Sequence, residues 1–268
     1  MKGSKGHVPY LSSQDLGTIG IVFSIVFAVV ASIVSAFGLE PVYLFSAIAF
    51  CVCLSVFIVY IRNKTCNSIR IAAGKSTIVV EYGDLFEYEG IVVIPVNGSF
   101  DTCVNEQIVS EKSLHGQFIK MYFPEDLSDL EEQIGSQLEG YDPKERDERK
   151  RCQYPVGTVV SVSHGGRRFL LLALSEFDQD YHAHLDFERY FQAICGLIRY
   201  ADMNSQGADI IMPVIGGGLS RLSSDIGDLL NLQVSTIKAM GGLGNGGSIK
   251  IVIHKKAKGI VCLPHSRG

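Results

Sequence analysis

The chain has 268 residues and a formal net charge of −4, with charged residues making up 19% of the total. This balance gives no general affinity for nucleic acid, so no nucleic-acid partner is expected. The seven cysteines are scattered and form no C-x-x-C pair, which argues against a disulfide framework or a zinc knuckle. The length leaves room for a membrane module beside one sizeable domain, or for two small domains.

Two uncharged stretches, at about residues 16–37 and 42–61, account for a mean hydropathy of +0.22, which is high for a soluble protein. At about 1.5 Å per residue each would form a helix roughly 30 Å long, enough to cross a hydrocarbon core of about 30 Å. We therefore expect an N-terminal tail and a two-helix transmembrane hairpin in residues 1–65, followed by a globular domain in residues 66–268.

Positive charge flanks the expected hairpin at its ends, with Lys2 and Lys5 before it and Arg62 and Lys64 after it. The turn between the helices carries only Glu40. Because positively charged flanks stay on the cytoplasmic side, both termini and the globular domain are expected in the cytoplasm.

Small residues recur at every fourth position of both expected helices, a spacing that lets helix backbones approach closely in lipid. They are Gly20, Ser24, Ala28, Ser32 and Ala36 in the first helix, here called the small-residue stripe, and Ala47, Cys51 and Ser55 in the second. The pattern either packs the two helices of one hairpin together or serves self-association between chains, and both interpretations stay open.

The remainder of the chain alternates apolar runs typical of strands with helical periodicity, which predicts an α/β domain. The expected strands are residues 77–82, 91–96, 156–162, 169–174, 210–215, 248–254 and 259–263, and the expected helices are residues 114–123, 184–204 and 220–240. Residues 125–151 are highly charged and contain one amphipathic helical pattern, so we expect a surface insertion there. The glycine-rich residues 241–247 are expected to form a flexible loop that could move over a ligand.

The run ADIIMPVIGGGLSRL, residues 208–222, reads as a strand, a loop of three glycines and the start of a helix. Because Gly216, Gly217 and Gly218 have no Cβ atoms, they would let an anion approach backbone N–H groups at a helix start. A phosphate group is the expected ligand. The alternative is a tight turn that binds nothing.

Other motifs are weaker. Residues 73–77 contain the GKS of a Walker A loop, but Ile69 stands where that loop needs glycine and no strand was expected before it. His182 and His184 lack a supported third ligand, so no metal is expected. No Ser-His-Asp or Cys-His arrangement stands out, and no catalytic residue is predicted.

The ordered occurrence of Gly83-Asp84, the strand IVVIPVN, the segment SLHGQF and the loop PVIGGGLSRL resembles a macro domain. The resemblance implies a mixed-sheet α/β/α sandwich that binds ADP-ribose or its derivatives. It places Asp84 at the adenine amine and Asn97 at the start of the V-N-A-A-N motif, where Gly98-Ser99-Phe100 replaces A-A-N. The implied first-loop ligand residues are Ser113, His115, Gly116 and Gln117, and the implied diphosphate-loop residues are Gly216, Gly217, Gly218, Leu219 and Ser220.

Macro-domain hydrolases typically use the distal asparagine and the glycine run of the first loop, and both are altered here. The resemblance therefore favours a binding protein. The alternatives are a membrane-anchored ADP-ribosyl hydrolase and a scaffold that tethers an ADP-ribosylated partner.

A two-helix hairpin joined to a divergent macro domain is similar to the membrane-anchored ThsA effectors of bacterial (type II) Thoeris anti-phage defence. The resemblance implies that a TIR-domain enzyme makes an NAD-derived signal, here histidine-ADP-ribose, and that no other cofactor is needed. It further implies that the bound effector oligomerises and disrupts the lipid of the inner membrane, which causes abortive infection.

Overall fold

The computed structural model describes residues 13–38, 46, 48–58, 68–105, 108–125, 127–141, 144–145, 152–177, 183–184, 186–217 and 225–257. The chain divides between Ile69 and Arg70 into two compact units. The strand expected at residues 259–263 lies outside the described residues.

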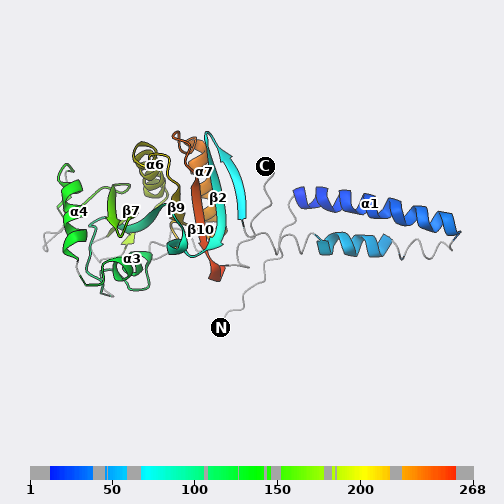
Figure 1. The fold of residues 1–268 in the computed structure, drawn as a ribbon, viewed down its shortest axis with the longest axis horizontal. Helices are drawn as coiled ribbons and strands as arrows, with labels where there is room; N and C mark the ends of the chain where they lie inside the picture. Colours follow the sequence, from blue (N-terminus) through cyan, green and yellow to red (C-terminus); the bar gives the residue numbers. More distant parts are fainter. Residues whose placement is uncertain are drawn as a thin grey trace. The chain divides into compact units, whose positions relative to one another are not determined.

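The N-terminal unit contains α1 (Ser13–Phe37) and a second helical segment, residues 48–58, which runs antiparallel to α1 (Figure 1). Within the described part of the chain, no helix is both long enough and apolar enough to cross a membrane. The transmembrane hairpin stays a prediction from the sequence.

The small residues of the two helical segments differ in exposure. All five residues of the small-residue stripe on α1 are exposed, and the Ser24 hydroxyl donates to the Gly20 carbonyl at 2.8 Å. Cys51 and Ser55, in contrast, are fully buried. The second segment therefore packs through its small residues, whereas hairpin packing does not account for the stripe on α1.

The second unit is built on a mixed sheet whose strand order is β1-β2-β10-β9-β3-β7-β6, with β8 paired to β7. The strands are β1 (Ser68–Ala73), β2 (Ser76–Gly83), β3 (Ile91–Asn97), β6 (Val159–His164), β7 (Arg167–Phe177), β8 (Ala183–His184), β9 (Ile210–Pro213) and β10 (Ile249–His254), and a separate pair joins β4 (Lys144–Glu145) to β5 (Cys152–Gln153). Strands β2, β10, β9, β3 and β7 are parallel neighbours, and β6 and β8 pair with β7 in antiparallel fashion. The predicted mixed sheet is confirmed.

Four helices of this unit are described: α3 (Leu114–Tyr122), α4 (Ser128–Leu138), α6 (Phe187–Asn204) and α7 (Ile226–Ala239). Short 3-10 turns occupy Leu85–Glu87 (η1) and Lys255–Ala257 (η2). Helix α6 contacts β7 and α7, whereas α3 contacts β3 and α4 contacts β6.

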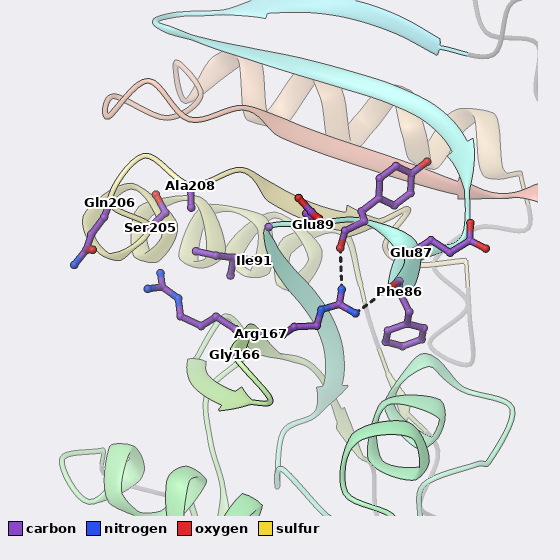
Figure 2. A pocket seen from close by; sticks show the side chains of 12 residues that line it. Phe86, Glu87, Glu89, Ile91, Gly166, Arg167, Ser205, Gln206 and Ala208 are labelled. Atoms are coloured by element: carbon purple, nitrogen blue, oxygen red, sulfur yellow. Dashed lines mark hydrogen bonds between the residues drawn. The ribbon is translucent and has the colours of Figure 1, made fainter.

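The segment between β2 and β3 crosses back from the carboxyl end of one strand to the amino end of the other and includes η1. Arg167, the first residue of β7, fastens this crossover: its guanidinium donates to the Phe86 carbonyl at 2.9 Å and to the Tyr88 carbonyl at 2.8 Å (Figure 2). The same guanidinium donates to the hydroxyl of Tyr122 on α3. One side chain thus joins the crossover, α3 and the sheet.

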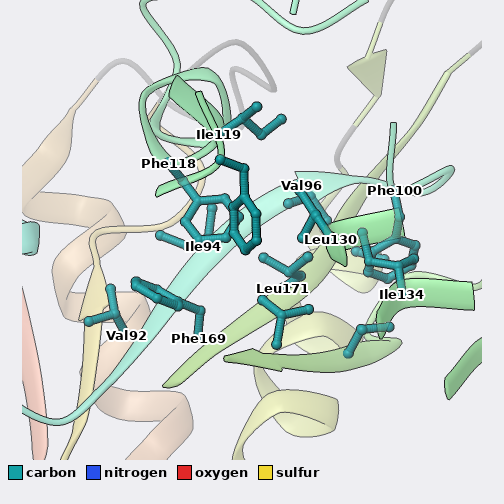
Figure 3. Packing of buried hydrophobic residues seen from close by; sticks show 14 of the residues in the cluster. Val92, Ile94, Val96, Phe100, Phe118, Ile119, Leu130, Ile134, Phe169 and Leu171 are labelled. Atoms are coloured by element: carbon teal, nitrogen blue, oxygen red, sulfur yellow. The ribbon is translucent and has the colours of Figure 1, made fainter. Parts of the chain in front are cut away.

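The core on one face of the sheet is formed by alternate side chains of β3 and β7 together with α3 and α4 (Figure 3). Phe118 of α3 is fully buried and lies 4.9 Å from Phe169 of β7, measured between ring centroids. The intervening strand residues, such as Val93 and Leu170, are also buried and belong to the opposite face. Because that face packs against α6, the unit is an α/β/α sandwich, as expected.

Helix α4 confirms the helix predicted from the amphipathic pattern, and it corrects the prediction that this part of residues 125–151 is a surface insertion. Leu130, Ile134 and Leu138 are buried in the core. On the same helix, the side-chain amides of Gln133 and Gln137 bond the backbone of β6 at the sheet edge, each through both its oxygen and its nitrogen. Helix α4 is therefore a layer of the fold that also covers a strand edge.

Residues 241–247 correct the prediction of a flexible loop over the ligand. Asp202, near the end of α6, accepts from the N–H groups of Gly244 at 2.7 Å and Asn245 at 3.2 Å, and Leu243 is fully buried. The loop precedes β10, so it lies at the amino end of the parallel strands. The expected ligand edge is the carboxyl end, which this loop does not cover.

Strand β1 was not predicted. It joins β2 through the Gly74-Lys75 turn, in which Gly74 has φ +60°, and an added Cβ there would lie 2.1 Å from the Gly241 carbonyl oxygen. The GKS sequence that imitates a Walker A loop is therefore a turn between strands.

Candidate functional site

The candidate ligand residues from three segments meet at one edge of the sheet. Asp84 follows β2, Asn97 ends β3, and Gly216 and Gly217 follow β9. These strands run parallel with β10 between β2 and β9, so their carboxyl ends share an edge. Open α/β sheets place ligands at such an edge.

Asp84 caps η1. One of its carboxylate oxygens accepts from the Phe86 N–H at 3.1 Å, and the side chain is half-buried. The other oxygen has no hydrogen-bond partner among the described residues. The cap fixes the carboxylate in place and leaves one oxygen to accept from a ligand.

The side-chain amide of Asn97 forms hydrogen bonds within the protein. Its amide nitrogen donates to the Asp101 carboxylate at 3.0 Å, and its amide oxygen accepts from the Asp101 N–H at 3.2 Å. The side chain is 7% exposed. Asn97 therefore closes the turn after β3 through both ends of its side-chain amide.

Phe100 stands where the V-N-A-A-N motif has its distal asparagine. It is 3% exposed, packs edge-on against Tyr154, and has φ +52°, a left-handed conformation that asparagine adopts more easily than phenylalanine. The backbone at this position therefore has a conformation that favours asparagine, but the Phe100 side chain packs in the hydrophobic core.

The first-loop residues form the start of α3. Ser113 is the N-cap, and its hydroxyl accepts from the Gly116 N–H at 3.0 Å. A Cβ at Gly116 would lie 2.3 Å from the Ser110 carbonyl oxygen, so only glycine fits. Gln117 donates to the Lys112 carbonyl at 3.0 Å. These contacts hold the loop against the helix.

His115 is a buried titratable residue among the candidate ligand residues. Burial lowers its pKa from 6.5 to about 4, because the imidazolium would lose its hydration. The side chain is 7% exposed. His115 is therefore neutral at physiological pH and offers hydrogen-bonding nitrogens rather than charge.

The diphosphate loop, which is the second of the two candidate ligand loops, leaves β9 at Pro213. It turns at Gly216, which has φ +96°. Gly217 is exposed, and a Cβ placed there would meet only Leu229 Cδ1, at 3.4 Å. Gly218, Leu219 and Ser220 lie outside the described residues. Within the described part of the loop, Gly216 is buried and Gly217 presents an open backbone at the carboxyl edge.

The start of α7 corrects the prediction of a helix beginning at about residue 220. The helix begins at Ile226, and the Asp225 carboxylate accepts from the N–H groups of Gly227 at 2.7 Å and Asp228 at 3.2 Å. Two carboxylates near this terminus repel an anion. Donors for a diphosphate must therefore come from the loop itself.

Sequence reasoning missed Gln233 and Arg167. Gln233 is fully buried on α7 and bonds the second loop, and its signal was a glutamine inside the apolar stripe of Leu229, Leu230 and Ile237. Arg167 gave no such signal, because its carbonyl partners lie about eighty positions earlier in the chain.

A cavity of about 680 Å³ lies at the opposite edge of the sheet, where β3 and β7 begin (Figure 2). Its lining includes Phe86, Ile91, Arg167 and Gln206, and none of the candidate ligand residues. The geometry of the parallel strands and the glycine loop points to the carboxyl edge as the ligand site.

The mixed sheet, its two helical layers and the loop at the carboxyl edge define a macro-domain-like α/β protein. The Oceanobacillus iheyensis macrodomain with ADP matches with a TM-score of 0.51 and 16% identity, over 72% of this chain and 90% of that one. A mutant of the same macrodomain with ADPR matches with a TM-score of 0.52 and 17% identity, over 72% of this chain and 94% of that one.

The family described as Thoeris protein ThsA, Macro domain, matches residues 78–254, and the chain belongs to this family. It is 29% identical over 195 residues to the Thoeris protein ThsA of Bacillus amyloliquefaciens (strain Y2). That match covers 68% of this chain and 64% of the relative, so the chain spans less than two thirds of the relative's length. The resemblance of the sequence to a ThsA-like macro-domain protein is confirmed.

Proposed function

We propose that the protein is a Thoeris defence effector whose second unit binds an ADP-ribose-type nucleotide. The observation that carries the proposal is the open backbone of Gly217 at the carboxyl edge, the same edge as the capped carboxylate of Asp84, in a chain of the ThsA macro-domain family. Backbone N–H groups without neighbouring side chains suit a diphosphate. A carboxylate oxygen suits the adenine amine.

The signal in this proposal is histidine-ADP-ribose made from NAD by a TIR-domain protein. The ADPR named with a structural neighbour supports the nucleotide part. In the first loop, buried and neutral His115 stands beside Gly116 in place of a run of glycines. We propose that this difference accommodates an extra group on the distal ribose of the ligand.

The proposed role is binding rather than hydrolysis. Phe100 replaces the distal asparagine and is committed to the core, while both ends of the Asn97 amide bond Asp101. In this proposal neither side chain orients a water molecule for hydrolysis. The competing proposal is a membrane-anchored ADP-ribosyl hydrolase.

The proposed location is the inner membrane, with a two-helix hairpin in the lipid and both termini cytoplasmic. Support comes from the uncharged stretches and from α1, whose apolar side chains Ile21, Ile25, Val29 and Ile33 are between 49% and 65% exposed. Large apolar side chains left exposed along one helix suit lipid or another helix better than water.

Ligand binding is proposed to assemble the protein. The exposed small-residue stripe supports contact between chains, since the hairpin does not use it. Holding several hairpins together raises their local concentration, so weak contacts suffice to disturb the bilayer. The ligand can drive this only if it binds the assembled form more tightly.

Calorimetric titration of the full chain in detergent tests the proposal, with histidine-ADP-ribose, ADP-ribose and AMP as ligands. We expect saturable binding in which histidine-ADP-ribose is the tightest, AMP is the weakest and no ligand is consumed. Turnover of an ADP-ribosylated substrate would support the hydrolase instead. Lack of binding by all three ligands would reject the proposal.

A further inference from the structure

Gln233 is a polar side chain within the apolar face of α7. It is 0% exposed. Its amide oxygen accepts from the Ile215 N–H at 3.0 Å, and its amide nitrogen donates to the Pro213 carbonyl at 3.0 Å. Burying an amide costs free energy unless both ends are bonded, and here both ends bond the same short stretch of backbone.

The two hydrogen bonds of Gln233 have the same pattern as those that a neighbouring parallel strand would make with β9. The last residue of β9 to pair with β10 is Pro213, opposite Val252. A residue on a neighbouring parallel strand would donate to one carbonyl and accept from the N–H two positions later. The Gln233 amide does this on either side of Val214, although it comes from a helix. It therefore holds the backbone from Pro213 to Ile215, where the turn after the strand begins.

We propose that Gln233 is the positioning residue of the diphosphate loop, an inference that rests on the proposed nucleotide binding. By holding the Ile215 N–H inward, Gln233 fixes where the chain turns at Gly216, whose φ of +96° redirects the backbone. The N–H groups that follow are thereby presented at the ligand edge. Gln233 does not touch the ligand itself.

The test compares Gln233→Leu and Gln233→Glu with a matched control, Thr236→Val, in the full chain in detergent. Thr236 lies one turn further along α7, is 3% exposed, and donates only to Leu232 in its own helix, at 2.9 Å. Thr236→Val therefore removes a buried hydroxyl from the same helix without touching the loop. Affinity for ADP-ribose is measured by calorimetry, and protection of the Ile215 amide is measured by hydrogen exchange.

Gln233→Leu should bind ADP-ribose about tenfold or more weakly, because two buried backbone groups lose their partners and the loop moves to satisfy them. Its Ile215 amide should exchange faster than in wild type. Thr236→Val should keep wild-type affinity and protection. Gln233→Glu should recover affinity relative to wild type as the pH is lowered, because a protonated carboxyl restores the donor to Pro213, and a loss of packing alone would not give this recovery.

Three outcomes overturn the inference, and they are distinguishable. Wild-type affinity in a folded Gln233→Leu variant shows that Gln233 does not position the loop, while leaving nucleotide binding intact. Unchanged protection of the Ile215 amide in that variant contradicts the proposed contact without reference to any ligand. Failure of the wild-type chain itself to bind ADP-ribose rejects the proposed function and, with it, this role of Gln233.

Discussion

Gly217→Glu tests the diphosphate loop most directly. A glutamate there places a negative charge beside the proposed diphosphate. Two like charges about 4 Å apart repel by about 1 kcal/mol in water and about 4 kcal/mol at an effective dielectric constant of 20. Gly217 is exposed, so the penalty falls between these limits. It corresponds to an affinity loss of between about fivefold and about a thousandfold.

The structure supplies the controls for this variant. Gly217 is not among the glycines with positive φ, and an added Cβ lies 3.4 Å from Leu229 Cδ1, an ordinary contact. Gly217→Ala should therefore fold and bind close to wild type. Gly217→Lys is bulkier than glutamate but carries the opposite charge, so it should bind at least as well as Gly217→Ala. Calorimetry at low salt gives the three affinities.

Two results would refute this reasoning. Wild-type affinity in Gly217→Glu would remove the glycine loop from the site. An equal loss in Gly217→Glu and Gly217→Lys would show that bulk, rather than charge next to a diphosphate, controls binding at this position.

Asp84→Ala should weaken ADP-ribose binding by about 1.5–3 kcal/mol through one lost hydrogen bond to a charged group, whereas an unchanged titration would move the adenine elsewhere. Stability should fall as the pH drops from 6.5 toward 4, since the unfolded state gains a proton that buried His115 resists, by up to about 3 kcal/mol. His115→Leu should flatten that decline in thermal melts, and an undiminished decline would assign it to other groups. Replacing Ser24 and Ala28 with leucine should spare ligand binding yet reduce ligand-induced assembly and membrane depolarisation; full depolarisation would assign the small-residue stripe no role between chains.

The sequence by itself predicted the elements whose pattern is local. The continuous apolar run of β3 and the helical spacing of α6 depend only on near neighbours in the chain, so their type followed without the fold. The same holds for the ordering of Asp84, Asn97 and the glycine loop, because each follows a strand that the pattern predicts. That order carried the family resemblance.

The sequence could not predict which polar side chains form hydrogen bonds within the protein. The Asn97 amide bonds Asp101, and Gln133 and Gln137 bond the backbone of β6 about thirty and twenty-four positions away. Such partners are chosen by tertiary packing, which brings distant segments within hydrogen-bond distance. The glycine content of residues 241–247 predicted flexibility, yet Asp202 fixes that loop from another helix.

Exposure, too, was decided only by the tertiary structure. In α1 and in the second helical segment, small residues at every fourth position form one face of each helix. Cys51 and Ser55 on the second segment are buried, whereas Ser24 and Ala28 on α1 are exposed. A periodic pattern fixes which residues share a face, because the helix repeat is local. What that face meets depends on the packing of whole elements, which brings together segments that are distant in the sequence.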